Sequence, residues 1–212
     1  MTSYGNPNED IIDQMRKGPK PWVTFAMIAA NVIVYFIMTT TGSTSDGTHM
    51  LEWGAAYRPY ILDGEYYRLF TSMFLHFGIS HLVNNMLLLL FAGYYLEMSV
   101  GQICFFFIYL LGGVGGNILS LWHDVYTDTS YISAGASGAV FAVMGALLVV
   151  TLIKRNSPDN LRISRLLLMI GFSVYVGFTS QGVDGWAHMG GLIAGALVCF
   201  LLSPFWKFRS FR

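Results

Sequence analysis

Charged residues are scarce in this chain of 212 residues. Lysine, arginine, aspartate and glutamate make up only 11% of it, whereas hydrophobic residues make up 54% and the mean hydropathy is +0.53. A soluble domain of this length carries roughly twice that charged fraction. The composition therefore predicts an integral membrane protein built as a single domain. Because the twelve basic and twelve acidic residues cancel, no nucleic acid or other acidic partner is expected.

Several kinds of site are also missing. Only two cysteines are present, Cys104 and Cys199, and both lie inside hydrophobic runs, which argues against a disulfide framework. There is no His-Glu-x-x-His motif, which a zinc-dependent intramembrane protease would need. The hydrophobic runs contain no aspartate, so a pair of intramembrane catalytic aspartates is excluded as well. We therefore expect no metal ion and no cofactor.

What the sequence does contain is long hydrophobic runs. We interpret six of them as membrane-spanning helices, at residues 22–40, 80–97, 103–121, 137–153, 166–180 and 187–204. A span needs about 20 residues, so the fourth and fifth are short. The first run follows a polar, acidic stretch, which is not the pattern of a cleaved signal peptide. The predicted fold is an all-α polytopic bundle of six transmembrane helices, with a cytoplasmic segment 1–21, a helical domain 22–205 and a basic cytoplasmic tail 206–212.

Basic residues are distributed unevenly between the loops. Ten of the twelve precede the first span, lie between the fourth and fifth spans, or follow the sixth. The other two, Arg58 and Arg68, lie in the long aromatic-rich loop 41–79. The positive-inside rule then predicts that both termini are cytoplasmic, and the even number of spans agrees. We expect a multi-pass protein of the cell membrane, surrounded by the lipid bilayer.

Polar residues within the spans form three clusters. His81 and Asn85 lie four residues apart near the start of the second span and so share a helix face. Ser137 opens the fourth span, and His188 lies near the start of the sixth. Polar side chains are costly in hydrocarbon, so they indicate a functional site. With the predicted orientation, all four residues lie in one layer near the outer face.

Small residues provide a way to bring Ser137 and His188 together. Gly138 follows Ser137, and Gly191 and Gly195 form a GxxxG spacing after His188, which allows membrane helices to pack closely. A serine hydroxyl becomes a strong nucleophile when an adjacent base takes its proton. The N–H groups at the start of the fourth span have no partner within the helix and can stabilise an oxyanion. Ser137 is therefore a candidate nucleophile and His188 its candidate general base.

Each of these features also has a structural explanation. The Gly-Ala-Ser-Gly sequence around Ser137 can serve as a helix cap, and GxxxG is a common packing motif in membrane bundles. His188 can be a hydrogen-bonded structural histidine, and His81 with Asn85 can bond to a neighbouring helix. The remaining histidines, His49, His76 and His123, are interpreted as loop or interface residues. We also expect Glu97 to be a structural anchor and Arg68 to pair with Glu65.

The order and spacing of these motifs resemble the rhomboid family of intramembrane serine proteases, over about residues 60 to 200. The matching segments are EYYRLFTSMFLHFGISHLVNN, YLEMSVG, GASGAVFAVMG and AHMGGLIAG. The resemblance implies a Ser–His dyad of Ser137 and His188 without an aspartate. It also implies an oxyanion hole formed by His81, Asn85 and the amide of Ser137. In such a fold the loop 41–79 dips into the membrane, and the fifth span with the loop 180–185 controls access of the substrate.

Two positions depart from the family pattern. Tyr67 stands where many relatives have tryptophan, and Phe141 stands where many have a tyrosine that packs on the histidine. Phenylalanine keeps the stacking and loses the hydroxyl, so we expect a changed orientation of His188 and retained activity. Gly135, Gly138 and Gly191 complete the expected supporting residues.

The predicted function is cleavage of transmembrane protein substrates near the outer membrane face. The alternative is a catalytically silent rhomboid-like protein that binds transmembrane helices. The presence of both Ser137 and His188 argues against this alternative. A small-solute transporter is disfavoured, because there is no inverted repeat and no charge near the middle of a span. No oligomeric state is predicted.

Overall fold

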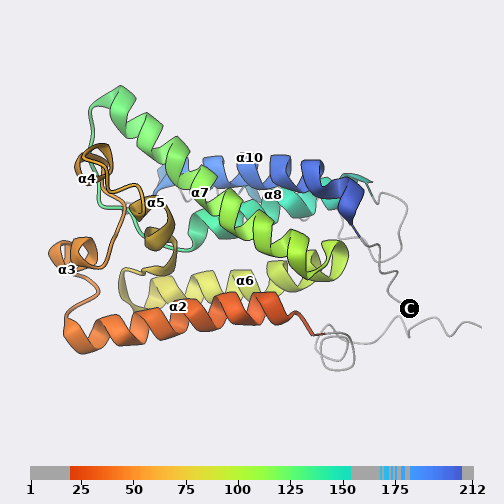
Figure 1. Cartoon of the computed structure of the whole chain (residues 1–212), viewed down its shortest axis with the longest axis horizontal. Helices are drawn as coiled ribbons and strands as arrows, with labels where there is room; N and C mark the ends of the chain where they lie inside the picture. Colours follow the sequence, from red (N-terminus) through yellow and green to blue (C-terminus); the bar gives the residue numbers. More distant parts are fainter. Residues whose placement is uncertain are drawn as a thin grey trace, which may run out of the picture.

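The computed structural model describes residues 20–153, seven positions between 168 and 179, and residues 182–206. Regular secondary structure in these residues is helical, apart from one isolated β-bridge between Ala56 and Ser133. The long helices, labelled in Figure 1, are α2 (Trp22–Thr41), α6 (Gly78–Val100), α7 (Gln102–Thr127), α8 (Ser137–Ile153) and α10 (Gly185–Leu202), which a short 3-10 helix, η2 (Ser203–Phe205), continues.

Four of these helices are long and apolar enough to cross a membrane: α2, α6, α7, and α10 together with η2. The fifth, α8, has 17 residues, which corresponds to about 25 Å. The prediction of a multi-pass, all-helical membrane protein is therefore confirmed. Only seven positions of the predicted span 166–180 belong to the described residues, and most of the terminal segments 1–21 and 206–212 lie outside them. The count of six spans thus stays a prediction.

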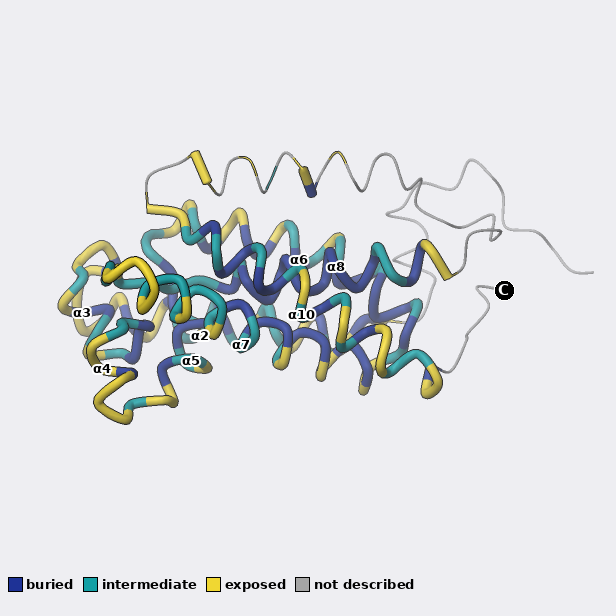
Figure 2. Tube along the Cα trace, turned by 90° about the horizontal axis from the view of Figure 1, so that it is seen from above, coloured by how far each residue is buried: buried dark blue, intermediate teal, exposed yellow. Residues whose placement is uncertain are grey.

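The exposed surfaces of these helices are hydrophobic, as expected for helices that face lipid. Figure 2 shows buried residues along the inner sides of the helices and exposed residues along their outer sides. A soluble bundle would place charged residues on the outer sides. Here the exposed residues include Ile103, Leu111 and Ile118 on α7, and Ile193, Leu197, Phe200 and Leu201 on α10.

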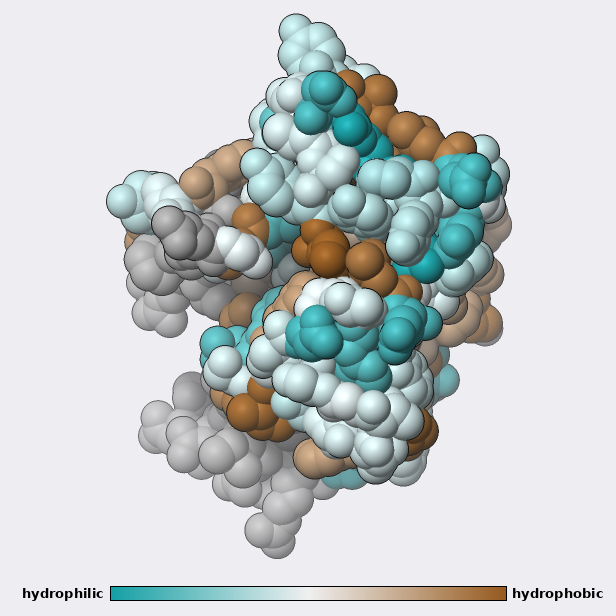
Figure 3. All heavy atoms as spheres, turned by 90° about the vertical axis from the view of Figure 1, so that its left-hand side faces the viewer, coloured by the Kyte–Doolittle hydropathy of each residue, from teal (hydrophilic) through white to brown (hydrophobic). Residues whose placement is uncertain are grey.

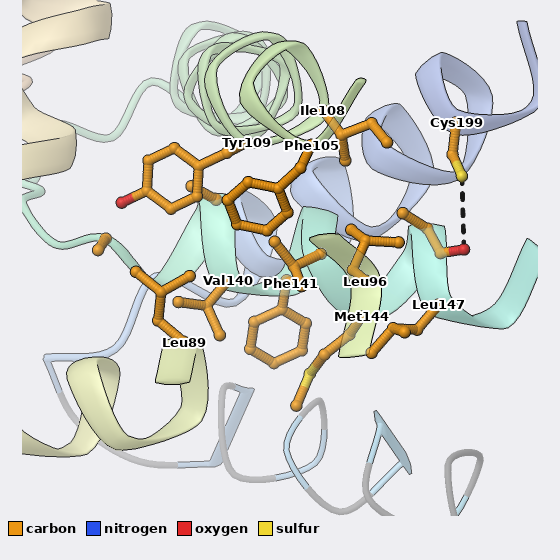
Figure 4. Close-up of a cluster of buried hydrophobic side chains, with 14 of the residues drawn as sticks. Leu89, Leu96, Phe105, Ile108, Tyr109, Val140, Phe141, Met144, Leu147 and Cys199 are labelled. Carbon is orange, nitrogen blue, oxygen red and sulfur yellow. Dashed lines mark hydrogen bonds between the residues drawn. The ribbon is translucent and has the colours of Figure 1, made fainter. Parts of the chain in front are cut away.

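Helix α8 lies at the centre of the bundle. It packs against α6, α7 and α10, and most of its residues are buried along its whole length. Figure 4 shows its side chains Val140, Phe141, Met144 and Leu147 among those of Leu89 and Leu96 from α6 and Phe105, Ile108 and Tyr109 from α7. The free, buried Cys199 of α10 donates to the carbonyl of Ala146 in the same core. The packing of three helices around α8 holds this helix, and with it Ser137, in a defined position.

Helix α7 is longer than the sequence predicts. Residues 122–127, which lie beyond the predicted span 103–121, continue the helix to Thr127, and the next residue, Asp128, adopts a left-handed conformation (φ 53°). The rings of Trp122 and Tyr126 stack one turn apart. Arg58 donates to the carbonyl of Asp124 (2.9 Å) and pairs with the carboxylate of Asp128 (2.9 Å). A cation near the C-terminal end stabilises a helix. Arg58 therefore stabilises the last turns of α7, although these residues are polar.

The segment between α2 and α6 is folded into short helices at one end of the bundle (Figure 1). They are α3 (Gly47–Glu52), α4 (Arg58–Leu62), α5 (Arg68–Thr71) and the 3-10 helix η1 (Ser72–Phe74). Seen from this end, the molecule carries mostly hydrophilic residues around a central group of hydrophobic ones (Figure 3). Insertion of this segment into the membrane stays a prediction.

Arg68 organises this segment. Its buried guanidinium pairs with Glu65 (2.7 Å) and donates to the carbonyls of Leu51 (2.7 Å) and Ala55 (3.0 Å). The expected pairing of Arg68 with Glu65 is therefore confirmed. The hydroxyl of Tyr67 also donates to Glu65 (2.6 Å). This hydrogen bond, followed by that of Arg68, lowers the pKa of Glu65 below its usual value.

The opposite end of the bundle contains the first residues of α2 and the last residues of α10 (Figure 1). Here the buried carboxylate of Glu97 accepts hydrogen bonds from the N–H of Val23 (3.1 Å), the N–H of Thr24 (2.7 Å) and the hydroxyl of Thr24 (2.7 Å). A carboxylate satisfies the unpaired donors at a helix start and complements its dipole. The prediction of Glu97 as a structural anchor is confirmed, with α2 as its partner.

Candidate active site

Ser137 is the first residue of α8 and is half-buried. The first hydrogen bond of the helix runs from the N–H of Val140 to the carbonyl of Ala136 (2.9 Å). The N–H groups of the three preceding residues therefore have no acceptor within the helix. They lie in the first turn of α8 together with Ser137, where the positive end of the helix dipole favours negative charge.

Two hydrogen bonds hold the turn that leads into Ser137. The N–H of Gly135 donates to the carbonyl of Ser72 (3.0 Å), and the N–H of Ala136 donates to Nε2 of His76 (3.3 Å). Since a backbone N–H can only donate, Nε2 of His76 carries a lone pair and the imidazole is neutral. His76 lies in the loop between η1 and α6, as expected, but its side chain is fully buried and supports this turn, which the sequence did not predict.

His188 lies one turn into α10 and is buried. Its imidazole stacks on the ring of Phe141, with centroids 4.2 Å apart and planes 11° apart. Phe141 stands four residues after Ser137, on the same face of α8. The imidazole of His188 therefore lies over the face of α8 that carries Ser137. Within the described part of the chain, Nδ1 of His188 is buried and has no hydrogen-bond partner.

The backbones of α8 and α10 touch at this level. A side-chain carbon on Gly191 would collide with the carbonyl of Gly138, and one on Gly138 would lie 3.4 Å from the carbonyl of Ala187. Both predicted glycines therefore lie at the contact between the two helices. A larger residue at position 191 would force apart the helices that carry Ser137 and His188.

Helix α7 takes part in the same contact. A side-chain carbon on Gly116 would lie 2.6 Å from the carbonyl of Ala187, and Gly112 faces Ala142 of α8 and Gly195 of α10. Three helices thus meet backbone to backbone. These α7 glycines were not predicted as contact residues, although the run GGVGG at 112–116 within a hydrophobic segment is a signal for close packing.

His81 borders Ser137 through the space above Gly135. A side-chain carbon on Gly135 would lie 2.8 Å from Cε1 of His81 and 3.6 Å from Oγ of Ser137. Gly135 also has a positive φ of 148°, which side chains rarely adopt. The absence of a side chain therefore leaves room between the imidazole of His81 and the hydroxyl of Ser137.

Asn85 lies one turn further along α6 and is buried. Its amide nitrogen donates to the carbonyl of His81 (3.2 Å) within the same helix. One of its two N–H groups is therefore used locally, and the other remains as a donor.

The described residues contain no cluster of three histidine, cysteine, aspartate or glutamate side chains that could hold a metal ion.

Comparisons with known proteins show which family the chain is similar to. A family model described as the Rhomboid domain matches residues 63–205. Rhomboid protease GluP of Bacillus subtilis (strain 168) is 35% identical over 176 residues, which cover 83% of this chain and 34% of GluP. RHOMBOID-like protein 7 of Arabidopsis thaliana is 34% identical over 167 residues, which cover 78% of this chain and 51% of the relative.

Rhomboid protease AarA of Providencia stuartii is 29% identical over 207 residues, which cover 86% of this chain and 73% of AarA. The chain thus spans about a third of the length of GluP, about half of RHOMBOID-like protein 7 and most of AarA. The Rhomboid domain match extends from Asp63, before α5, to Phe205 and so includes Ser137 and His188. This chain is a multi-pass membrane protein that belongs to the rhomboid family.

Proposed function

We propose that this protein is an intramembrane serine endopeptidase in which Ser137 is the nucleophile and His188 the general base. One observation carries the proposal: the imidazole of His188 stacks on Phe141, one turn from Ser137 on the same face of α8. The glycine contact between α8 and α10 supports it, because it brings the two helices close at that level. The relatives named as rhomboid proteases support the same chemistry.

The reaction proceeds in two halves. His188 takes the proton of the Ser137 hydroxyl as the oxygen attacks the carbonyl carbon of the scissile bond. When the tetrahedral intermediate collapses, His188 gives that proton to the leaving amine and an acyl-enzyme remains. Water then attacks the acyl-enzyme, His188 takes its proton, and the Ser137 oxygen is released with the proton restored. No carboxylate is assigned to the imidazole, because Nδ1 of His188 has no partner in the described residues.

The oxyanion of the intermediate needs hydrogen-bond donors in place before the reaction. We assign this role to the N–H of Ser137, the imidazole of His81 and the free N–H of the Asn85 amide. The position of His81 beside the space above Gly135, which Oγ of Ser137 also borders, supports the assignment. The dipole of α8 adds to the stabilisation.

Substrates are transmembrane segments of other proteins. Ser137 stands at the start of the hydrophobic helix α8, and we place it below the membrane surface, in a cavity that water can enter. An α-helical substrate hides its carbonyls in internal hydrogen bonds, so it must become extended at the cleavage site. We therefore expect segments with glycine or proline near the cleaved bond to be preferred.

The orientation follows from the distribution of basic residues. The start of α2 and the end of α10 lie at the same end of the bundle, which is consistent with both termini being on one side (Figure 1). The positive-inside rule assigns this side to the cytoplasm. Ser137 and His188 then lie in the outer half of the cell membrane, and cleavage occurs near its outer face.

The proposal is tested with a fluorophosphonate probe, which labels an activated serine covalently. The purified chain should be labelled, the Ser137→Ala variant should not, and Ser203→Ala, which changes a serine at the opposite end of α10, should be labelled like the wild type. Cleavage of a model transmembrane substrate should follow the same pattern. A folded chain that binds the substrate but is neither labelled nor active would instead be a catalytically silent rhomboid-like protein.

A further inference from the structure

Asp184 immediately precedes α10 and bonds through both carboxylate oxygens. Its Oδ1 accepts from the N–H of Ala187 (2.8 Å), which caps the helix. Its Oδ2 accepts from the hydroxyls of Ser120 (2.6 Å) and Ser133 (2.7 Å). Its backbone carbonyl accepts from the N–H of His188 (3.2 Å). A carboxylate with three donors is held firmly, because hydrogen bonds to a charged acceptor are short and strong.

The two hydroxyl donors come from different parts of the fold. Ser120 belongs to α7, whereas Ser133 belongs to the segment that leads into α8. The backbone of Ser133 is also paired with that of Ala56 through two hydrogen bonds of 2.9 Å. Ser133 is therefore held on one side by the segment before α4 and on the other by Asp184.

The positions of Ser133 and Asp184 along the chain connect them to the candidate dyad. Ser133 stands four residues before Ser137, and Asp184 stands four residues before His188. The Ser133–Asp184 bond therefore joins the segment that presents the nucleophile to the start of the helix that presents the base. The carboxylate acts through the backbone, since Nδ1 of the His188 imidazole has no partner among the described residues.

We propose that Asp184 is a positioning residue that sets the separation of Ser137 and His188 through its bond to Ser133. This role rests on the proposed function, because it requires that Ser137 and His188 react together. A displacement of a reacting group by about 1 Å can lower a rate by about a hundredfold. One bond remote from the substrate can therefore affect turnover strongly without affecting substrate binding.

Ser120 and Ser133 provide a matched pair of variants. Both hydroxyls donate to the same oxygen at nearly the same distance, but only Ser133 leads to Ser137. Ser133→Ala removes the bond between the two parts of the candidate site, and Ser120→Ala removes a similar bond to α7. Asp184→Ser keeps a side chain that can cap α10 but is too short to hold Ser133 as well. Asp184→Asn keeps the shape, and its amide can donate to both hydroxyls.

The experiment measures kcat, KM, the rate of fluorophosphonate labelling and Tm for the full chain in detergent. Ser133→Ala and Asp184→Ser should each lower kcat and the labelling rate by about ten- to a hundredfold, with little change in KM. Their effects should not add in the double variant, because both break the same bond. Ser120→Ala should lower Tm about as much as Ser133→Ala does, but it should lower kcat clearly less. Asp184→Asn should recover part of the turnover that is lost in Asp184→Ser.

The outcomes separate this role from the proposed function. If the wild-type chain is labelled at Ser137 and the Ser133 and Asp184 variants change only Tm, the positioning role is overturned and Asp184 is a helix cap. Equal losses of kcat in the Ser120 and Ser133 variants would overturn it as well, since general loosening of the bundle would then explain them. A wild-type chain that is folded but not labelled would overturn the proposed function and, with it, this role.

Discussion

The imidazole of His188 lies flat on the ring of Phe141, at a centroid distance of 4.2 Å and an interplanar angle of 11°. The two residues come from α10 and α8, the two helices that carry the candidate dyad. The expectation that phenylalanine at position 141 keeps the stacking is confirmed. Nδ1 of His188 has no hydrogen-bond partner in the described residues, and the ring contact restrains the orientation of the imidazole.

The stacking predicts that the ring of Phe141 supports turnover. Phe141→Leu keeps much of the side-chain volume but removes the flat surface, and an aromatic contact contributes about 0.5–1.5 kcal/mol. We expect kcat to fall by up to about tenfold, whereas Phe141→Tyr, which retains the ring, should stay close to the wild type. Steady-state cleavage of a transmembrane substrate measures both. An unchanged kcat in Phe141→Leu would show that the stacking does not orient His188.

If Ser137 and His188 form a dyad, the losses of cleavage activity in their single variants should not add in the double variant. Ser137→Ala and His188→Ala should each abolish cleavage, and the double variant should be no worse than either, because the two residues act as a unit. Single-turnover assays with excess enzyme are sensitive enough to compare the residual rates. Equal Tm values in the three variants and the wild type serve as the control for folding. Substantial cleavage by either single variant would exclude the assignment of that residue.

A side chain at position 135 should lower activity, because it would crowd the imidazole of His81. In Gly135→Ala the new carbon would lie 2.8 Å from Cε1 of His81, and the positive φ would be strained. Gly64→Ala is a matched control, because Gly64 also has a positive φ (104°) but nothing lies within 4 Å of the added carbon. We expect both variants to lose some Tm and only Gly135→Ala to lose kcat. Equal kcat values in the two variants would contradict the crowding.

Removal of one proposed oxyanion donor should lower turnover without abolishing it. Removing one donor from an oxyanion hole lowers kcat by about 10²–10³. Here the backbone N–H of Ser137 remains, so His81→Ala and Asn85→Ala should retain measurable turnover, above that of Ser137→Ala. Because such donors act in the transition state, kcat should fall more than substrate affinity. Full turnover with a lower Tm in Asn85→Ala would assign Asn85 to its hydrogen bond with the carbonyl of His81 alone.

Glu65 predicts a loss of stability at acidic pH. Its hydrogen bonds from Tyr67 and Arg68 lower its pKa in the folded state below 4.5. The ionised carboxylate therefore stabilises the fold at neutral pH, and this contribution disappears as the pH falls from about 4.5 through the lowered pKa. The Tm of the wild type should decrease over this range more than that of Glu65→Gln. Parallel Tm curves for the two proteins would show that the carboxylate has no such role.

Features of the molecule that depend on residues close in sequence could be predicted without a structure. The hydrophobic runs locate α2, α6, α8 and α10 to within a few residues, and the Gly-Ala-Ser-Gly motif places Ser137 at the first position of α8. The local pair Glu65 and Arg68 was found in the same way. These features follow from the periodicity of helices, the cost of polar groups in lipid and the preferences of helix ends, all of which act over a few neighbouring residues.

The tertiary structure decided which distant groups meet. His76 binds the N–H of Ala136, 60 residues away, and Asp184 binds Ser133, 51 residues away. The extension of α7 depends on Arg58, which reaches Asp124 from another helix. Each of these polar residues looks like an ordinary loop residue in the sequence, because a hydrogen bond needs only a donor and an acceptor at the right distance. That distance is determined by the backbone contacts among α7, α8 and α10, where the glycines allow three helices to meet.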